Sequence, residues 1–187
     1  MAESDEILVI RSQKGDRQSF ELLIIKYQRR VFSLIYRLTN NPQAVEDLAQ
    51  ETFLKAFAAI KKFGQRSSFY TWLRKIAVNT CLNYLSANTP VLLEENILVN
   101  KIGLNPGFIE GKVSNPETAL MVKELNEGIR DAVDSLARKH RIAFLLRELE
   151  DMSYEEIAEA IDCPVGTVRS RLHRARQELQ EKLISYI

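Results

Sequence analysis

The stretch of sequence that decides the fold lies near the C-terminus and reads SYEEIAEAIDCPVGTVRSRLHRAR, from Ser153 to Arg176. Its first four residues form a capping box, in which the Ser153 hydroxyl and the Glu156 carboxylate each satisfy an exposed backbone amide at a helix start. After a tight turn at residues 162–166, an apolar stripe continues at helical spacing through the helix that follows. A short capped helix, a turn and a basic amphipathic helix together predict a helix-turn-helix.

The second helix of this pair has the composition of a DNA-recognition helix. Its apolar stripe leaves polar and basic side chains on the outer face, at Arg169, Ser170, His173, Arg174 and Gln177. A helix fits the major groove of duplex DNA, where arginine can bind both acceptors of a guanine edge. The alternative is that these arginines only make a C-terminal helix soluble. We favour DNA binding, because the cap, the turn, the stripe and the charge all agree with it.

The rest of the chain is predicted to be helical, as two all-α domains joined by a flexible linker. Apolar residues recur at steps of three and four through most of residues 1–86, which we interpret as a first helical domain. The longest such stripe consists of Phe20, Leu23, Ile24, Tyr27, Val31, Leu34, Ile35 and Leu38. The periodicity fails in residues 87–115, where prolines and glycines accumulate, so this segment is predicted to be the linker. Its many apolar residues indicate a partner or local folding. Residues 116–187 form the second domain, which contains the helix-turn-helix. The inward residues expected on its first helix are Val122, Leu125, Ile129, Val133 and Leu136.

The composition excludes several classes of protein. Of the 187 residues, 45% are hydrophobic and 27% are charged, which is the balance of a globular protein rather than of a disordered chain. The longest charge-free stretch, residues 76–93, is too polar to cross a membrane, and the acidic N-terminus is unlike a secretory signal. The two cysteines and two histidines match no metal or redox spacing. We therefore expect a cytoplasmic protein with no metal and no other cofactor.

Basic residues gather in two parts of a chain whose net charge is only +1. Besides the recognition helix, residues 52–93 contain six basic residues and no acidic one. Two separate basic surfaces suggest two contacts with a polyanion, although chance clustering on solvated helix faces is the alternative. In residues 52–93, a short polar loop precedes a helix with Arg74, Lys75, Asn79 and Asn83 along one side. Amide and basic groups beside such a loop suit single-stranded DNA, whose base edges are exposed.

Two further features of the first domain have competing interpretations. Four aromatic residues around the polar loop could stack on bases, namely Phe63, Phe69, Tyr70 and Trp72. Phe69 and Trp72 lie on the inward stripe, and for these two we favour a place in the core. A helix in the middle of the domain has a mixed acidic and apolar face, which could bind a protein partner or could simply be solvated. That face consists of Asp47, Gln50, Glu51 and Leu54.

These stretches together resemble the extracytoplasmic-function sigma factors of the sigma-E type. The resemblance covers both domains at the family's spacing and leaves the linker unmatched. It implies an alternative sigma factor, the promoter-specificity subunit of bacterial RNA polymerase, without enzymatic activity of its own. The motifs are YQRRV at residues 27–31, DLAQETFLKA at 47–56, FYTWLRKIAVNT at 69–80 and the helix-turn-helix sequence quoted above.

The resemblance also implies a role for each candidate site. The residues that would bind the clamp helices of the largest subunit of core RNA polymerase are Asp47, Gln50, Glu51 and Leu54. Those that would bind and help melt the minus-ten promoter element are Gly64, Gln65, Arg66, Ser67, Ser68, Arg74, Lys75, Asn79 and Asn83. Those that would bind the minus-thirty-five element are Thr167, Arg169, Ser170, Arg171, His173, Arg174 and Arg176. The same domain would touch the flap of the second-largest subunit. An anti-sigma factor commonly masks the polymerase-binding surfaces in this family, and we expect the free protein to be monomeric.

Three positions depart from the family's pattern. A basic pair that often follows the position of Leu85 is missing, which weakens the case for a DNA-backbone contact there. His173 stands where relatives often have an aromatic residue, so the promoter bases that are read could differ. Ala137 replaces a usual proline, which leaves the start of the next helix open.

Two other functions fit parts of the sequence. A free-standing helix-turn-helix repressor or activator would bind duplex DNA as a dimer, but no dimerisation helix is evident in the pattern. A small α-helical enzyme would need an active site, and nothing near Asp47 or Glu51 supplies a nucleophile, a metal or a phosphate-binding loop.

Overall fold

The structure, a computed structural model, describes residues 4–87 and 116–184 of the chain. Every regular element in these ranges is helical, which confirms the predicted all-α class. The chain divides into two compact units after Leu104. The linker predicted for residues 87–115 lies outside the described residues, apart from its first residue, and the predicted domain boundaries remain predictions.

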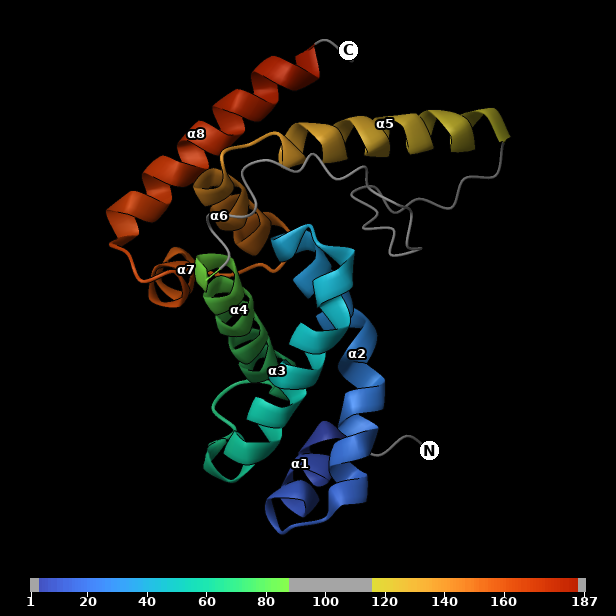
Figure 1. The fold of residues 1–187 in the computed structure, drawn as a ribbon, viewed down its shortest axis with the longest axis vertical. Coiled ribbons are helices and arrows are strands. Elements are labelled where there is room, and N and C mark those ends of the chain that lie inside the picture. The colour runs from blue at the N-terminus through green and yellow to red at the C-terminus, as the bar shows by residue number, and fades with distance from the viewer. Residues whose placement is uncertain (1–3, 88–115, 185–187) are drawn as a thin grey trace. The chain divides into compact units, whose positions relative to one another are not determined.

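The first unit is a bundle of four α-helices with two short 3-10 turns (Figure 1). α2 packs against the other three helices, and α3 and α4 also pack against each other. The helices are α1 (Asp5–Gln13), α2 (Arg17–Thr39), α3 (Val45–Ala59) and α4 (Phe69–Ala87), and the turns are Pro42–Ala44 and Ile60–Lys62.

The buried face of α2 follows the predicted apolar stripe. Asp16 caps the helix start by accepting hydrogen bonds from the backbone amides of Gln18 (3.0 Å) and Ser19 (3.3 Å). Asn40 ends the helix in the left-handed conformation, with φ of 51°. Seven of the eight stripe residues are buried and the eighth, Ile24, is half-buried, so this row forms the centre of the unit's core.

Aromatic rings join α2, the end of α3 and the start of α4. Phe69 is only 4% exposed, which confirms its predicted place in the core. Its ring centroid lies within 6.5 Å of those of Phe20 (6.5 Å), Tyr27 (5.7 Å), Phe63 (6.2 Å) and Trp72 (5.7 Å). Such ring pairs contribute about 0.5–1.5 kcal/mol each beyond the area that they bury. The cluster therefore holds the loop between Phe63 and Phe69 against a rigid support.

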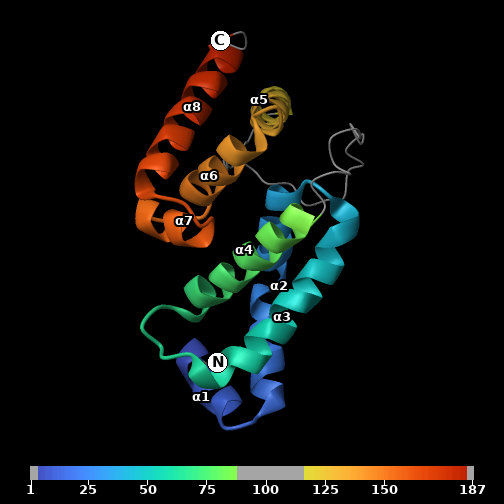
Figure 2. The same ribbon diagram turned by 60° about the vertical axis from the view of Figure 1, so that its left-hand side comes forward.

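The second unit contains four more helices, of which α8 packs against the other three. Figure 2 shows α8 running alongside α6 and α7. Val133 and Leu136 are buried as predicted, whereas Leu125, which was also expected inward on α5, is 40% exposed. The helices are α5 (Pro116–Asp134), α6 (Arg138–Glu148), α7 (Tyr154–Ala160) and α8 (Val165–Leu183).

α7 and α8 form the predicted helix-turn-helix. The backbone N–H of Glu156 donates to Ser153 Oγ (3.1 Å), and the backbone N–H of Ser153 donates to Glu156 Oε2 (2.9 Å), so the capping box is present. The apolar stripe of α8 is buried, as shown by Val168, Leu172, Ala175 and Leu179. α6 begins at Arg138 despite the missing proline, with Ala137 as its N-terminal cap.

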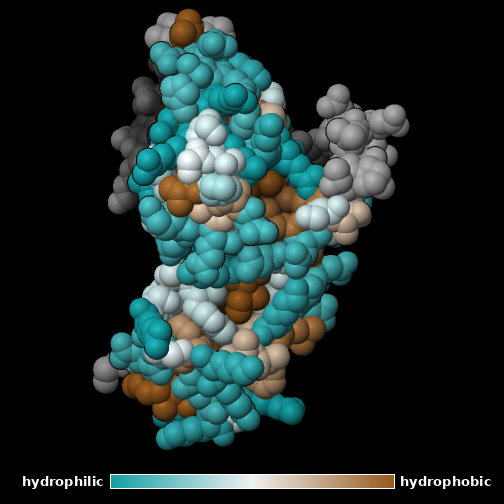
Figure 3. All heavy atoms as spheres, turned by 90° about the vertical axis from the view of Figure 1, so that its left-hand side faces the viewer, coloured by the Kyte–Doolittle hydropathy of each residue, from teal (hydrophilic) through white to brown (hydrophobic). Residues whose placement is uncertain are grey.

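The surface is largely hydrophilic on the face drawn in Figure 3, with separate hydrophobic patches. No helix in residues 4–87 or 116–184 is long and apolar enough to cross a bilayer. Within the same ranges, no three His, Cys, Asp or Glu side chains gather in a way that could hold a metal ion.

The thiol of Cys81 on α4 is buried against α3, and we expect it to be unreactive. Burial and, to a lesser extent, the negative charge of Glu51 together raise its pKa to about 12. In the native protein at pH 8, a thiol-specific chromogenic disulfide should therefore modify Cys163, which is half-buried, and leave Cys81 unmodified. Because folding raises this pKa from 9.0, the protonated thiol stabilises the fold below pH 9, and that contribution is lost as the pH rises towards 12. Rapid modification of two thiols per native chain would contradict this close packing of α3 and α4.

Candidate functional site

A polar loop joins the 3-10 turn after α3 to the start of α4, and both of its ends are fixed. At the first end, the backbone N–H of Phe63 donates to the carbonyl of Ile60 (3.0 Å). At the second, Ser68 Oγ accepts the backbone N–H of Thr71 (3.1 Å) and so caps α4. The five loop residues between these ends are exposed, namely Gly64, Gln65, Arg66, Ser67 and Ser68.

A pocket of about 330 Å³ opens beside this loop. The rings of Phe63 and Trp72, stacked with centroids 4.8 Å apart, supply its apolar lining. Lys62 and Arg66 add two cationic groups, and Gly64 and Ser67 complete the lining. A flat ring can lie on an aromatic surface while nearby cations bind a phosphate. The pocket therefore has the chemistry to hold one unstacked nucleotide.

The exposed face of α4 continues away from this pocket. Lys75, Asn79 and Asn83 are one helical turn apart, and both asparagines are exposed while Lys75 is half-buried. Trp72 lies on the same side, about one turn before Lys75. Arg74 was predicted to share this side, but it is only 8% exposed. Its position on the helix turns it towards the core, so it is not part of the exposed row.

Two residues of the pocket were not expected from the sequence. Trp72 was assigned to the core, yet it is half-buried and one side of it lines the pocket. Lys62 was noted only as part of the basic stretch. Lys62 stands next to the loop in the sequence, which could have indicated its role. Only the folded chain shows that the 3-10 turn brings it to the pocket.

The predicted partner face on α3 is exposed along its whole length. Asp47, Gln50, Glu51 and Leu54 are all exposed, and the Leu54 side chain is 63% exposed. Glu51 forms an ion pair with Lys55 one turn later, with Nζ and Oε1 2.6 Å apart. An exposed leucine among carboxylates is typical of a surface that binds another protein.

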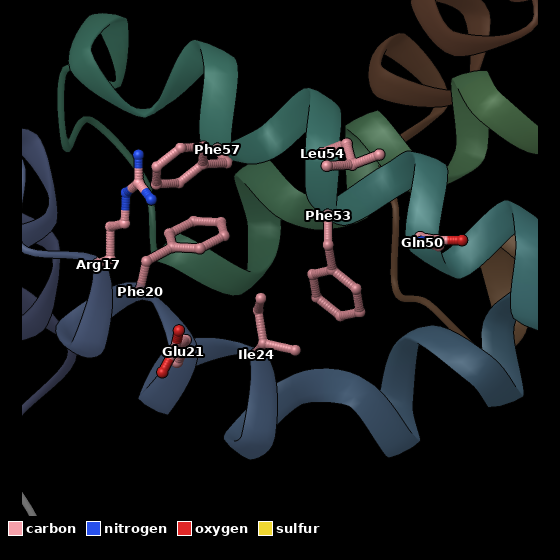
Figure 4. A pocket seen from close by; sticks show the side chains of 8 residues that line it. All are labelled: Arg17, Phe20, Glu21, Ile24, Gln50, Phe53, Leu54 and Phe57. Atoms are coloured by element: carbon pink, nitrogen blue, oxygen red, sulfur yellow. The ribbon is translucent and has the colours of Figure 1, made fainter.

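A hydrophobic groove of about 550 Å³ between α2 and α3 extends this face. Figure 4 shows its side chains facing one another across the groove, with Arg17 beside Phe57 at one end. The sequence did not predict the groove, because its two walls come from helices whose separate stripes each looked like ordinary core. The lining residues are Arg17, Phe20, Glu21 and Ile24 from α2, and Gln50, Phe53, Leu54 and Phe57 from α3.

The outer face of α8 is polar and basic, as predicted. Arg169, Ser170, His173 and Arg174 are exposed, opposite the buried stripe of the helix. Two of the predicted DNA contacts, Thr167 and Arg171, are half-buried at the flanks of the helix.

Comparison with known proteins decides the family. Residues 23–90 match sigma-70 region 2, and residues 126–179 match sigma-70 region 4. Over 181 residues the chain is 42% identical to the ECF RNA polymerase sigma-E factor of Escherichia coli (strain K12), which covers 96% of this chain and 94% of that protein. The chain belongs to the extracytoplasmic-function sigma factors.

This sigma factor is also similar to the RNA polymerase sigma-H factor of Pseudomonas aeruginosa. The identity is 39% over 186 residues, which cover 97% of this chain and 94% of that one. The protein is therefore an alternative sigma factor, and the function implied by the sequence motifs is confirmed.

Among solved structures, the sigma factor has the fold of RpoE from Bartonella quintana, which was determined in complex with the anti-sigma factor NepR. The TM-score is 0.62 at 24% identity, and the match covers 89% of this chain and 97% of that one. The likeness supports the all-α fold of the sigma factor.

The two matched regions of the sigma factor contain different candidate sites. The loop pocket, the exposed row of α4 and the face of α3 all lie within the match to region 2. The helix-turn-helix lies within the match to region 4, of which residue 179 is the last. α1 precedes both matches.

Arg176 of the sigma factor has a partner inside the protein. Its Nη2 donates to Glu148 Oε1 of α6 (2.8 Å), and hydrogen bonds to Glu148 and then Tyr154 raise its pKa. The sequence predicted that Arg176 would bind promoter DNA. In the structure Arg176 is exposed and also ties α8 to α6, and its contact with promoter DNA stays a prediction. The exposed ion pair itself contributes only about 0–1 kcal/mol to stability.

Proposed function

We propose that this sigma factor opens the minus-ten promoter element by capturing an unstacked base in the pocket beside loop 64–68. The pocket is the observation on which the proposal depends, because it joins stacked aromatic rings to two cations on an exposed loop. Base stacking on aromatic side chains contributes about 1–3 kcal/mol, which can offset the cost of unpairing one base. Asn79 and Asn83 would then hydrogen-bond the edges of neighbouring bases along α4.

The partner face of α3 and the adjoining groove would dock on core RNA polymerase. The resemblance assigns this contact to the clamp helices of the largest subunit. A helix binds in a groove through apolar anchors, and Leu54 and Phe57, which are 63% and 40% exposed, offer the surfaces for them. Asp47 and Glu51 on the rim would attract basic residues of the partner and orient it. The helix-turn-helix unit would contact the flap of the second-largest subunit.

α8 would bind the minus-thirty-five element as duplex DNA in the major groove. Arg174→Ala should weaken binding to that element by about 1–3 kcal/mol and relax the preference at one base position, because a bidentate contact with a base would be lost. Fluorescence anisotropy with a panel of singly substituted duplexes measures both effects. Arg176→Ala is the matched control, and it should leave the base preference unchanged because Arg176 pairs with Glu148. An unaltered preference in Arg174→Ala would remove this residue from base readout.

The remaining expectations follow from the same assignment. When it is not bound to polymerase, the sigma factor would be a monomer in the cytoplasm, and it would have no catalytic activity. An anti-sigma factor would hold it inactive by covering the α3 face. RpoE from Bartonella quintana was determined in complex with the anti-sigma factor NepR, which supports regulation by an anti-sigma factor.

One experiment separates the proposal from the alternatives. The purified protein is mixed with core polymerase, the complex is isolated, and transcription is measured from a preferred promoter obtained by selection and sequencing. We expect a complex that initiates only at that promoter. Specific duplex binding by the full-length protein alone, with no complex and no transcription, would instead favour a free-standing repressor or activator.

A further inference from the structure

Gln13, the last residue of α1, links this helix to the start of loop 64–68. Its Nε2 donates two hydrogen bonds, to the carbonyl of Ile60 (3.0 Å) and to the carbonyl of Phe63 (2.8 Å). The contact is partly buried and joins residues that are 47 and 50 positions apart in the sequence. It is therefore a tertiary contact that the local sequence pattern does not reveal.

The two carbonyls lie at either end of the 3-10 turn that follows α3. Ile60 is the first residue of this turn and its carbonyl also accepts the backbone N–H of Phe63, which directly follows the turn. A carbonyl oxygen has two lone pairs, so that of Ile60 can accept both donors, and an uncharged amide has two N–H donors, which match the two carbonyls. Gln13 therefore acts as a side-chain cap on this turn and fixes the backbone at Phe63.

Phe63 connects this cap to the proposed base pocket. Its ring lines the pocket and stacks on Trp72, and its carbonyl is the one that Gln13 holds. The other end of α1 is also fixed, because Asp5 accepts hydrogen bonds from Lys26 and from the Tyr27 hydroxyl of α2. α1 is thus anchored at both ends, with its second anchor on the backbone of the pocket.

We propose that Gln13 is a positioning residue for promoter melting, which holds the pocket open and preformed before DNA arrives. α1 lies outside the match to region 2, so nothing in that match assigns it a part in DNA binding. The inference rests on the proposed function of the pocket. Because the loop is already ordered in a preformed pocket, it loses less conformational entropy when a base enters.

The test uses the holoenzyme, assembled from the full chain and core polymerase. Gln13→Met keeps the size of the side chain and removes both donors, whereas Gln13→Lys keeps a donor group. We expect Gln13→Met to slow open-complex formation on a duplex promoter by at least about fivefold, since two hydrogen bonds are lost. The defect should shrink on a template whose minus-ten region is already unpaired. Gln13→Lys should stay close to the parent, and Gln18→Met, an exposed glutamine at the start of α2, should have no effect.

A second measurement separates positioning from general stability. Replacing Gln65–Ser68 with Gly-Ser-Gly-Ser takes Arg66 and Ser67 from the pocket and loosens the loop that Gln13 would hold, so adding Gln13→Met to this loop replacement should cause a smaller further defect than Gln13→Met causes alone. If the loop replacement slows melting and Gln13→Met does not, the inference on Gln13 fails and the proposed function stands. If the loop replacement itself has no effect, the proposed function fails. Equal loss on duplex and unpaired templates, or equal loss in Gln13→Lys and Gln13→Met, overturns the positioning role. Should Gln13→Met fail to fold, Gln13→Glu, which lacks both donors, takes its place in every comparison.

Discussion

The double variant Asp47→Lys and Glu51→Lys should abolish co-purification with core RNA polymerase and transcription from every promoter. Both carboxylates are exposed on α3, next to the hydrophobic groove that we assign to the polymerase. Reversing charges within a docked interface costs several kcal/mol, because it replaces attraction with repulsion in a partly dehydrated contact. The measurement is affinity for core polymerase, with run-off transcription as the functional readout.

The fold should survive this change. Neither side chain belongs to the buried row of α3, and exposed substitutions usually shift stability by about 0.5 kcal/mol or less. Glu51 loses its ion pair with Lys55 and a like-charged pair replaces it, which costs a few tenths of a kcal/mol. The circular-dichroism signal and the melting temperature should therefore remain close to those of the parent.

A control with the same change in charge is available on α5. Glu124 and Glu127 are exposed and lie close on one helix, so Glu124→Lys with Glu127→Lys alters net charge equally. This control should bind core polymerase normally. If the α3 variant retained its affinity for core polymerase within about twofold, the α3 face would not bind polymerase. Another surface of the protein would then have to make this contact.

The helices were predictable because their signals are local. The capping box at Ser153 and the apolar stripe of α8 need only residues within a few turns of one another, and the structure has both. The burial of Phe69 followed from the same periodicity. For these elements the hydrophobic pattern alone decides which side of the helix is buried.

The features that the sequence did not predict depend on distant pairs of residues. The groove has one wall from α2 and the other from α3, so neither helix encodes it alone. Arg176 is one of several arginines in a row, and only the position of Glu148 on α6 gives it a partner inside the protein. Arg74 looked like its neighbour Lys75, but a rotation of about 100° along the helix places it in the core. A charged side chain at the edge of a stripe is thus ambiguous until the packing of the neighbouring helix is known.

Replacing residues Gln65–Ser68 with Gly-Ser-Gly-Ser should impair promoter melting and leave assembly with core polymerase intact. Keeping serine at position 68 preserves the cap of α4, so the helix should remain folded. The replacement removes Arg66 from the pocket and loosens the loop beside it. We expect open-complex formation on a duplex promoter to fall by about one to two orders of magnitude, which corresponds to the ~1.5–3 kcal/mol that a hydrogen bond from a charged group such as Arg66 supplies. Asn79→Ala should act in the same direction with a smaller effect, because it removes one amide contact.

Comparing a duplex template with one already unpaired at the minus-ten element shows whether the loop replacement acts on promoter melting. Loop and amide groups can contact a base only after it has left the stack, so part of their binding free energy is used to drive the unpairing. On a template already unpaired at the minus-ten element that cost is absent, and the loop variant should approach the parent. Permanganate reactivity of unpaired thymines measures the open complex on both templates, and Gln43→Ala, an exposed amide before α3, serves as the control. Equal defects on the two templates would indicate damage to folding or to polymerase binding, and the loop would lose its proposed part in opening the promoter.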